Sequence, residues 1–577
     1  MITSKVEQGV RGSPITRINP SPPSRLLSYP IPDLIQTRVH TQVETIDKLS
    51  QKLKNKYNEV NLLLFYILFF PARSFKLKTK NIMIGIIIGA LLGFFFYGIH
   101  RYVADRLFYN CPPGPRPVPF LGNFPAMAPE GKKKTWQVLT EIGRKYFDKY
   151  GSPIFTFYFG QVRVLVLNDS KSINEALVSQ SKVFSWRFDR YVPGCGHVEP
   201  GIIGSNHDEW RRYRRFGMKA MRDFGMGKDM MVMKIQDEVG HFIEEIQRNR
   251  TNKAFCPKEL LAISVSNVIC SFVFGERFNY ENKVLSELIH QMEVMVKRPM
   301  AEGALFMSLP FIDYFKTYSG ADEYVNFQNI TTVMVEKAIA EHRKDFDPAN
   351  IRDFPDLFLQ QEKDEEPFDL KTYGLIMSDM FLAGTETTAT SLSWTLLYLA
   401  TWPEIQTKCQ QAIDSVIESD RLANLSDRPQ LVYIDALMCE ILRHTSMVPG
   451  SLFHTNLDVP SKIAGYDCPP WTMILYNVYA VQHDERYWGD PEVFRPERWI
   501  DENGKLLSHS THFMPFGIGP RICLGEALAR VEYFIFIVAM LQRFNFKLET
   551  PIDIRDGSQG GVVHSPPDFP VIITPRH

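Results

Sequence analysis

A glycine-rich loop that holds a single cysteine constrains this chain more than any other feature of its sequence. The stretch FMPFGIGPRICLGEALAR, residues 513–530, runs directly into a segment with helical spacing. A thiolate that binds a metal must be deprotonated and shielded from oxidation. Glycines let backbone N–H groups approach the sulfur of Cys523, and the positive end of a helix beginning near Leu524 would stabilise its charge. The loop therefore predicts an anionic metal ligand, with Arg521 as a cation for an anionic partner such as a carboxylate.

Two other interpretations of this loop are open. A lone cysteine is most often a small core hydrophobe. Gly517-Ile-Gly519 resembles the start of a dinucleotide-binding loop, but GxGxxG is not completed and no βαβ unit surrounds it. The eight cysteines lie far apart, with no CxxC and no Cys/His cluster, which argues against a zinc site or a disulfide framework and fits a reducing compartment.

Composition limits the class of protein. With 45% hydrophobic and 23% charged residues, the chain has the balance of a globular protein with a sizeable core. Its formal net charge is +0, so a nucleic-acid partner held by bulk charge is not expected.

The first hundred or so residues differ from the rest of the chain. Residues 1–81 are expected to be disordered or a doubtful extension, because residues 1–40 are rich in proline, serine and arginine. Residues 82–99, IMIGIIIGALLGFFFYGI, are uncharged and just long enough for a transmembrane anchor; a buried core helix is the alternative. Basic residues flank this run on both sides, and a chain begun at Met83 would leave only Arg101 and Arg106 to hold the following domain in the cytosol.

The remaining chain is predicted to be one mainly α domain with small β-sheets. Residues 100–117 form a proline-rich hinge, and residues 118–577 form the globular domain, with no linker dividing it. Residues 152–169 alternate around a glycine turn, as a β-hairpin does. Strands are expected only there and in 450–480. Helical spacing covers 229–250, 257–275, 283–298, 324–344, 371–402 and 404–418.

The pattern Phe516-x-x-Gly519-x-Arg521-x-Cys523-x-Gly525 resembles the haem-binding signature of cytochrome P450 monooxygenases. The resemblance runs from about Pro112 to the C-terminus and is nearest to the microsomal, drug- and lipid-oxidising animal branch. It implies the cytochrome P450 fold and a haem b cofactor (iron protoporphyrin IX) with Cys523 as the iron ligand. Phe516 and Arg521 would contact the cofactor.

Other motifs agree with this resemblance. Glu440-Ile-Leu-Arg443 is similar to the family's ExxR, and residues three apart on a helix can pair. With Arg498, in a segment similar to the family's PERF, they would form a buried charge network that holds the cysteine loop.

A threonine-rich stretch, residues 383–388, lies inside the helical pattern of 371–402. Glycine and threonine are poor choices for the middle of a helix. The pattern is either a tolerated irregularity or a local opening of the helix over the haem. The resemblance assigns Ala383 to the haem contact, Thr387 to the hydroxyl that steadies the group bound to iron, and Glu386 to proton delivery.

Haem propionates would need polar partners. The resemblance assigns this role to a WxxxR motif on one helix face and to two residues from other segments: Trp210, Arg214, Arg187 and His454. The chain departs from this branch at two neighbouring positions. Trp186 stands where glycine is common, and Phe453 where proline is common.

The activity implied is monooxygenation, in which one atom of O2 enters a small lipophilic substrate such as a xenobiotic, fatty acid or steroid. Electrons would come from NADPH through NADPH–cytochrome P450 reductase, with cytochrome b5 as a further candidate donor, attracted by basic residues 211–222. The implied location is the endoplasmic reticulum membrane, with the domain facing the cytosol. Specificity is expected in 188–205 and 300–320, including 308–312, and around Phe381. A reductase-independent peroxide isomerase or dehydratase, and a haem-thiolate protein that only binds ligands, are the alternatives.

Overall fold

The computed structural model describes most of the chain after residue 101. The described residues are 102–119, 121–127, 133–187, 191–192, 196–197, 200–223, 229–297, 321–363, 366–418, 421–554 and 558–576, with Gly89, Gly93 and Ile99. The chain divides into two compact units, residues 1–94 and 95–577, and every helix and strand from α4 onward belongs to the second.

The predicted N-terminal elements fall almost entirely outside these residues. This holds for 1–81 and for all of the anchor 82–99 except Gly89, Gly93 and Ile99, each of which is helical. Among the described residues no helix is both long enough and apolar enough to span a bilayer. Within the predicted hinge, residues 102–108 are helical, whereas the proline-rich residues 111–117 have no regular structure. Helix is possible at 102–108 because the first proline comes only at Pro112.

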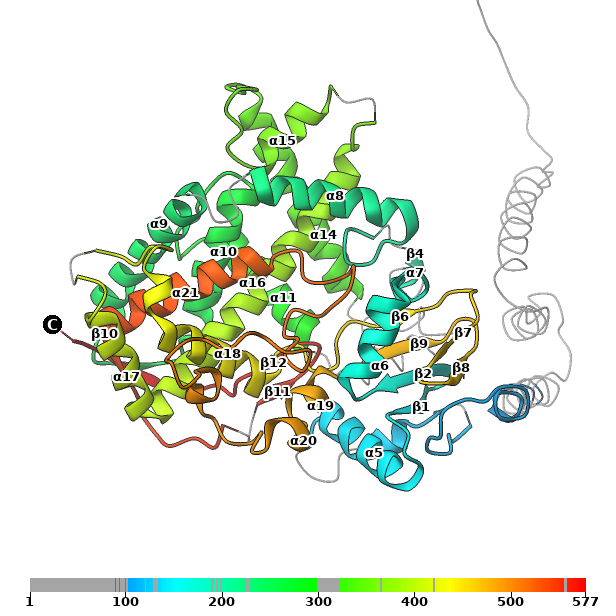
Figure 1. Ribbon diagram of the computed structural model, residues 1–577. Helices are drawn as coiled ribbons and strands as arrows, with labels where there is room; N and C mark the ends of the chain where they lie inside the picture. Colours follow the sequence, from blue (N-terminus) through cyan, green and yellow to red (C-terminus); the bar gives the residue numbers. More distant parts are fainter. Residues whose placement is uncertain are drawn as a thin grey trace, which may run out of the picture. The chain divides into compact units, whose positions relative to one another are not determined.

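The second unit is mainly helical, as predicted (Figure 1). Its longer helices are α5 (Thr135–Tyr150), α8 (His207–Asp223), α9 (Asp229–Glu245), α10 (Lys258–Val273), α11 (Lys283–Lys297), α14 (Ala321–His342), α16 (Leu370–Thr401), α17 (Pro403–Asp414), α18 (Val432–Thr445) and α21 (Glu526–Arg543). Shorter ones are α4 (Phe124–Met127), α6 (Ser170–Asn174), α7 (Ser181–Phe184), α15 (Phe354–Gln361), α19 (Val478–Gln482) and α20 (Glu485–Trp488), with single turns η1 (Glu175–Ser179), η2 (Ile246–Arg250), η4 (Arg428–Gln430) and η5 (Pro496–Trp499).

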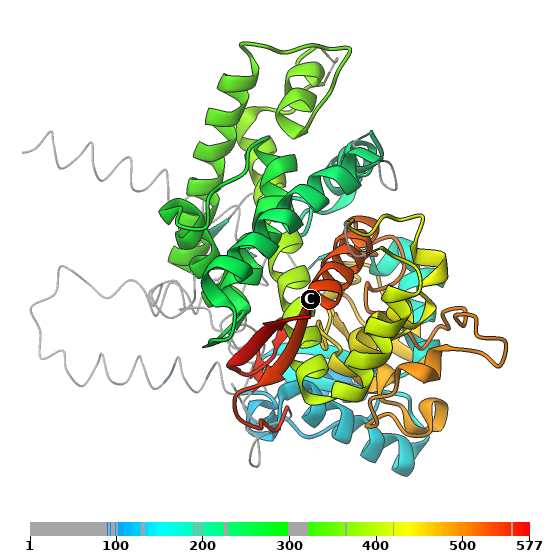
Figure 2. The same cartoon turned by 90° about the vertical axis from the view of Figure 1, so that its left-hand side faces the viewer.

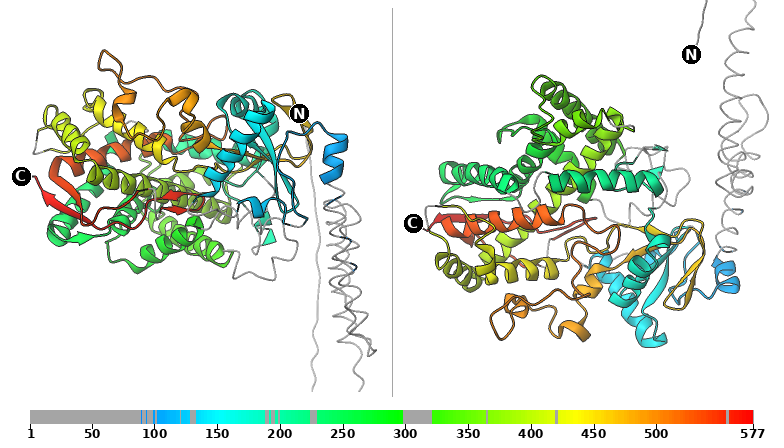
Figure 3. Two further views of the ribbon diagram at one scale, coloured as in Figure 1. Left: turned by 90° about the horizontal axis from the view of Figure 1, so that it is seen from below. Right: turned by 45° about the horizontal axis from the view of Figure 1, so that its top comes forward.

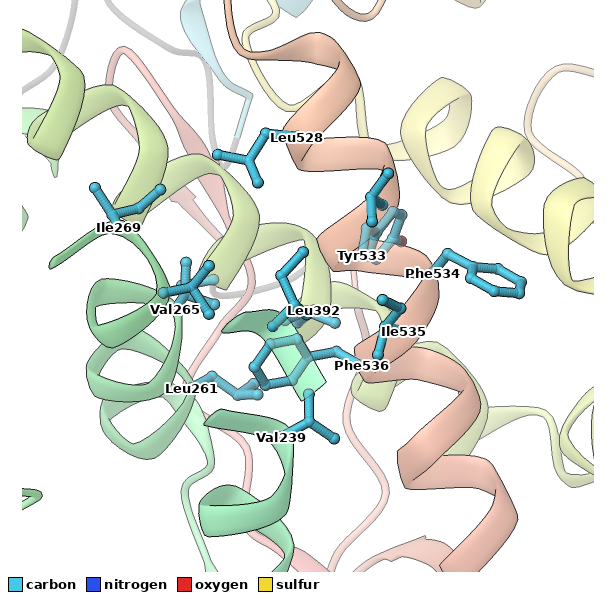
Figure 4. Packing of buried hydrophobic residues seen from close by; sticks show 14 of the residues in the cluster. Val239, Leu261, Val265, Ile269, Leu392, Leu528, Tyr533, Phe534, Ile535 and Phe536 are labelled. Carbon is cyan, nitrogen blue, oxygen red and sulfur yellow. The ribbon is translucent and has the colours of Figure 1, made fainter. Parts of the chain in front are cut away.

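Helix α16 lies at the centre of the core. It packs against α10, α14, α18 and α21. Figure 4 shows Leu392 of α16 among Val265 of α10, Val239 of α9 and Phe536 of α21, and all four side chains are fully buried. A helix that is apolar on nearly every face is stable only when surrounded in this way. The threonine-rich stretch is therefore held deep inside the protein.

The predicted hairpin is present and belongs to a four-stranded sheet. Strands β1 (Ile154–Phe159) and β2 (Val162–Leu167) pair antiparallel from Ile154 opposite Leu167. Strand β9 (Met473–Tyr476) pairs parallel to β2, and β6 (His454–Thr455) closes the sheet beside β9. Strand residues are buried on both faces, which the apolar sequences IFTFYF and VRVLVL allow.

The prediction that strands occur only in 152–169 and 450–480 is wrong. A sheet of order β10-β13-β5 joins β10 (Phe544–Leu548), β13 (Val571–Pro575) and β5 (Ala254–Phe255). Figure 2 shows β10 and β13 in red beside the C-terminus, and Figure 3 shows them at the end of the unit opposite the hairpin in cyan. Segments of five residues carry too little periodicity to be recognised alone. The remaining strands are β3 (Tyr191–Val192), β4 (Gly196–His197), β7 (Ser461–Ile463), β8 (Tyr466–Cys468), β11 (Gln559–Gly560) and β12 (His564–Ser565).

Candidate functional site

The cysteine loop is a tight turn that ends on the first residue of α21. The N–H of Cys523 donates to the carbonyl of Phe516 at 2.9 Å, which closes the loop. Gly519 has a φ of 76°, and a Cβ there would lie 2.2 Å from the carbonyl oxygen of Leu177. Only glycine meets both conditions. The loop is therefore fixed against η1 as well as against α21.

The sulfur of Cys523 lies at a helix N-terminus. The N–H groups of Gly525 and Glu526 donate to it, and α21 begins at Glu526, two residues later than predicted. These donors and Arg214 act to lower the pKa of the thiol, but burial is the larger effect and raises that pKa above its usual value. The protein atoms alone thus favour a neutral thiol, and a bound metal cation would be needed to make the thiolate the stable form.

Cys523 combines accessible surface with close surroundings of protein atoms. The residue carries solvent-accessible surface, yet burial among protein atoms is the main cause of its raised thiol pKa. Both observations hold if the accessible surface faces inward. Ala383 is exposed in the same sense: it lies in the central helix α16, between the buried side chains of Phe381 and Thr385.

Three arginines gather near Cys523, and their own charges destabilise one another. Burial and the neighbouring guanidinium groups of Arg187 and Arg214 lower the pKa of Arg521 to about 8. Burial likewise lowers the pKa of Arg187 to about 10 and lowers that of Arg214. An anion bound between these guanidinium groups would remove the repulsion.

Backbone carbonyls, rather than carboxylates, accept the hydrogen bonds of two of these arginines in the described structure. Arg521 donates to the carbonyls of Ser185 at 2.8 Å, of Ile202 at 3.3 Å and of Ser205 at 2.6 Å. Arg187 donates to the carbonyls of Ile203, Leu452 and Phe453 at 3.2, 3.1 and 2.9 Å. The guanidinium groups are thereby oriented but not neutralised.

A tryptophan adds an unused donor to this group. The indole N–H of Trp210 is buried and has no hydrogen-bond partner among the described residues. The Arg521 guanidinium carbon lies 4.1 Å from the centroid of the Trp210 ring. A buried donor without an acceptor costs stability, so its retention points to a ligand that accepts from it.

His454 is buried and uses one ring nitrogen for a hydrogen bond within the protein. Its Nδ1 lies 2.7 Å from the carbonyl oxygen of Phe184, which can only accept, so Nδ1 carries the proton. Burial and the nearby charge of Arg187 hold the pKa of the imidazole well below its usual value. In the neutral ring, Nε2 is an acceptor, and it can donate to an anion only when the imidazole is protonated, a form that a neighbouring anion stabilises.

The predicted charge network is assembled around Glu440. Arg443 donates to both carboxylate oxygens of Glu440 at 2.8 Å, and Arg498 donates to one of them at 3.2 Å. The indole of Trp499 and the N–H of Arg495 add two further donors at 3.0 Å. Burial raises the pKa of the Glu440 carboxyl, but these hydrogen bonds and the two arginine charges outweigh it and lower that pKa. Glu440 is therefore ionised.

Gln482 connects this network with the cysteine loop. Its carbonyl accepts from Arg443 at 2.9 Å, and its side-chain oxygen accepts from the N–H of Met514 at 3.3 Å. Met514 begins the loop that carries Cys523. The network therefore reaches the loop through one glutamine, a residue that has no characteristic spacing in the sequence.

The threonine-rich part of α16 differs from the expected opening. The helix is continuous from Leu370 to Thr401. The hydroxyl of Thr387 donates to the carbonyl of Ala383 at 2.8 Å, and Ser391 donates to the carbonyl of Thr387 at 2.9 Å. Hydroxyls that bond one turn back allow threonine and serine inside a helix without a break. Gly384 serves close packing, because a Cβ there would lie 2.7 Å from Ile269 Cδ1.

The expected proton donor, Glu386, and the expected hydroxyl, Thr387, are consecutive residues within one turn of α16. Thr390 donates to the carboxylate of Glu386 at 3.4 Å. Glu386 and Thr387 are both half-buried, whereas Thr388 beside them is buried. The two residues thus have partly accessible side chains in an otherwise enclosed helix.

Sequence reasoning missed Asp379. Its side chain is buried and accepts the N–H of Ile203 at 2.8 Å, and burial raises the pKa of its carboxyl to about 7. A Cβ on Gly201 would lie 2.5 Å from the same carboxylate, so the two segments are in close contact. The available signal was an acid in the apolar run before Ala383, on the same helix face four residues earlier. Of the predicted specificity segments, 300–320 lies outside the described residues, as do parts of 188–205.

Together these groups define the site of a haem-thiolate protein. An inward-facing cysteine sulfur lies at a helix N-terminus, while three arginines and an unpaired indole N–H suit the two carboxylates of a porphyrin. A sequence model of the cytochrome P450 family matches residues 112–572. The chain belongs to the cytochrome P450 family, and its fold, haem cofactor and monooxygenase class follow from that membership.

Individual members of the family are similar in sequence to this chain over most of their own length. Cytochrome P450 2U1 of Bos taurus is 33% identical over 494 residues, covering 81% of this chain and 89% of the relative. Cytochrome P450 2J5 of Mus musculus is 35% identical over 472 residues, covering 81% and 92%. Cytochrome P450 2H2 of Gallus gallus is 36% identical over 470 residues, covering 80% and 91%.

Proposed function

We propose that this protein inserts one atom of O2 into a small lipophilic substrate, with electrons from NADPH delivered by a reductase. The second oxygen atom leaves as water. The observation that carries the proposal is the inward-facing Cys523, with two amide donors on its sulfur and a cluster of arginines nearby. Thiolate-ligated haem supplies dioxygen binding and O–O bond cleavage when bound.

The chain's own residues hold and orient this cofactor. Cys523 would ligate the iron, while Arg187, Arg214, Arg521 and Trp210 would neutralise the propionates. The lowered pKa values of the three guanidinium groups support this assignment, because bound carboxylates would remove the mutual repulsion. Phe516 closes the loop beneath the iron ligand through its carbonyl.

The central helix would deliver protons. Glu386 is the proposed entry group, and Thr387 the hydroxyl that passes a proton onward, four residues after the haem-facing Ala383. The Thr387 hydroxyl already bonds to the Ala383 carbonyl, which fixes its oxygen and leaves its lone pairs as acceptors. Buried side chains on both sides of this stretch limit access of bulk water.

Electrons would enter over a basic stripe on α8. Four basic residues with exposed side chains repeat at helical spacing along one side: Arg211, Arg215, Lys219 and Arg222. Such a stripe would attract an acidic flavoprotein, and cytochrome b5 is a further candidate donor.

Reversing Arg215 and Lys219 to glutamate would slow reduction of the haem iron, especially at low ionic strength, while the haem content stays the same. Unaltered reduction kinetics would exclude this docking surface.

The proposed location is the endoplasmic reticulum membrane, with residues 82–99 as anchor and the haem domain in the cytosol. Leu107 and Phe108, just after that run, are 73% and 77% exposed, which favours contact with lipid. Anchoring would be tested by alkaline carbonate extraction of the full chain. Release of a deletion of 82–99, with retention of the full chain, is the expected result.

One experiment tests the activity. The full chain, reconstituted with the reductase and NADPH, would be given a panel of drugs, fatty acids and steroids, and products would be read by mass spectrometry for a gain of one oxygen. A carbon monoxide difference spectrum would first establish thiolate ligation, lost in Cys523→Ala and kept in Cys256→Ala, which removes another exposed cysteine. Turnover of a hydroperoxide without reductase, and none with NADPH, would favour the isomerase; haem binding without turnover would favour a ligand-binding protein.

A further inference from the structure

Trp186 packs against the first turn of α8 beside the arginine cluster. Its indole lies against the ring of His207, with 4.6 Å between ring centroids and 33° between the ring planes, and its centroid lies 5.6 Å from the Arg211 guanidinium carbon. It also forms a buried apolar cluster with Trp210 and Leu457. His207, Trp210 and Arg211 are spaced i, i+3 and i+4, so the ring covers one side of that turn.

Hydrogen bonds fix the backbone at Trp186 and at the residue that follows it. Its carbonyl accepts the N–H of Thr455 at 2.9 Å. The next residue, Arg187, exchanges two hydrogen bonds with the side chain of Asn206, at 2.7 and 3.1 Å. Little freedom is left for the indole to move away, and it is only 8% exposed.

The contacts of Trp210 show what this packing orders. Trp210 belongs to the same buried apolar cluster as Trp186 and Leu457, and the Arg521 guanidinium carbon lies 4.1 Å from the centroid of the Trp210 ring. The Trp210 N–H is the buried donor without a partner among the described residues. An indole packed in an apolar cluster and against a guanidinium has little freedom to turn, so its N–H keeps one direction.

We propose that Trp186 is a positioning residue for the haem propionates. It fixes the indole of Trp210, and it excludes water from the edge where Arg187 and Arg521 would meet the carboxylates. The proposal rests on the proposed function only in requiring that haem binds beside these residues. Salt-bridge strength in a site of this kind depends on water exclusion, so loss of the ring would weaken retention of the cofactor.

The test compares haem release from full-length variants to excess apomyoglobin, followed in the Soret band. Trp186→Gly is expected to lose haem about tenfold faster than the wild type, because aromatic and cation–π contacts are both removed. Trp186→Phe keeps an aromatic ring and should restore most of the retention. Trp471→Gly is the matched control, because that tryptophan is 44% exposed and lies outside the cluster.

A second measurement separates positioning from a general loss of stability. Resonance Raman bands of propionate bending should shift in Trp186→Gly, remain unchanged in Trp471→Gly and return in Trp186→Phe. Unchanged bands with wild-type haem release would overturn the proposal, as would equal acceleration in Trp471→Gly. If Trp186→Gly does not fold, Trp186→Leu decides by the same two readouts: faster release with shifted bands supports the proposal, and wild-type values overturn it. A wild-type chain with no thiolate–haem carbonyl spectrum would instead refute the proposed function at the start.

Discussion

Glu440 and Arg443 face each other across one turn of α18 with two hydrogen bonds of 2.8 Å, and neither side chain exposes any surface. Arg443 also donates to the carbonyls of Gln482 and Pro491. This pair therefore joins α18 to the end of α19 and to the loop at Pro491, and Gln482 of α19 in turn contacts the cysteine loop.

Arg443→Ala should be severely destabilising. It leaves the Glu440 carboxylate buried with part of its compensation removed, at a cost of about 3–5 kcal/mol. The free energy of unfolding in urea, measured with the haem content, checks this. Arg248→Ala removes a comparable pair from the surface, between Arg248 and Glu244, and should cost less than about 1 kcal/mol. Similar losses in both variants would contradict the role given to burial.

Asp379 predicts a particular pH dependence of stability. Between pH about 4 and pH about 7 the folded chain keeps a proton on this carboxyl that the unfolded chain releases. The contribution of Asp379 to stability therefore falls as the pH rises through that window, by roughly 4 kcal/mol in total, and changes no further above it.

Asp379→Asn cannot ionise, so its stability relative to the wild type should rise from pH 4 to pH 7 and then level off. Urea midpoints across that range would show this. The matched control is Asp568→Asn, which alters an exposed carboxylate paired with Lys258 and should run parallel to the wild type. A parallel curve for Asp379→Asn as well would mean that the carboxyl is already charged in the folded protein.

Thr387→Ala should uncouple electron consumption from product formation. The variant keeps α16 intact but lacks the hydroxyl proposed to pass a proton, so product per NADPH should fall by about tenfold or more, with hydrogen peroxide formed instead. Thr387→Ser should retain most of the coupling. Thr401→Ala removes a hydroxyl with the same backbone bond at the far end of the helix, to the Leu397 carbonyl at 2.7 Å, and should leave the ratio unchanged.

Glu532 offers a stabilising substitution. This side chain of α21 is fully buried, neither of its oxygens has a hydrogen-bond partner among the described residues, and burial raises its pKa well above the usual value. Glu532→Met, which fills a similar volume without polar atoms, should increase the free energy of unfolding by about 1–3 kcal/mol. Glu532→Gln should gain little. A loss of stability in the methionine variant would show that the Glu532 carboxyl makes a stabilising hydrogen bond in the folded protein.

Local motifs explain how much of this site the sequence could predict. Cys523, Arg521 and Phe516 lie within one loop, and Trp210 and Arg214 within one helical turn, so the resemblance to the family's motifs could be recognised in short stretches of sequence. The hairpin was equally recognisable, because β1 and β2 alternate around a single turn.

Tertiary contacts explain the rest. The partner of Asp379 is a backbone N–H in another segment, and Gln482 reaches the cysteine loop from α19, so neither has a characteristic spacing. Of the two interpretations of the threonine-rich stretch, the continuous helix fits the tolerated irregularity, because threonine hydroxyls can return their bonds to the same helix. The raised thiol pKa of Cys523 depends on how many atoms surround it, which a sequence does not state.

The parallel pairing of β2 with β9 has a consequence for biosynthesis. Val164 pairs with Met473, a separation of 473 − 164 = 309 residues. While the ribosome extends the chain, the apolar β2 edge must wait for most of the protein to emerge before its neighbour exists, and an unpaired edge of that kind invites aggregation. Completion of this sheet should therefore be a late step, for which chaperone protection of the nascent chain matters most.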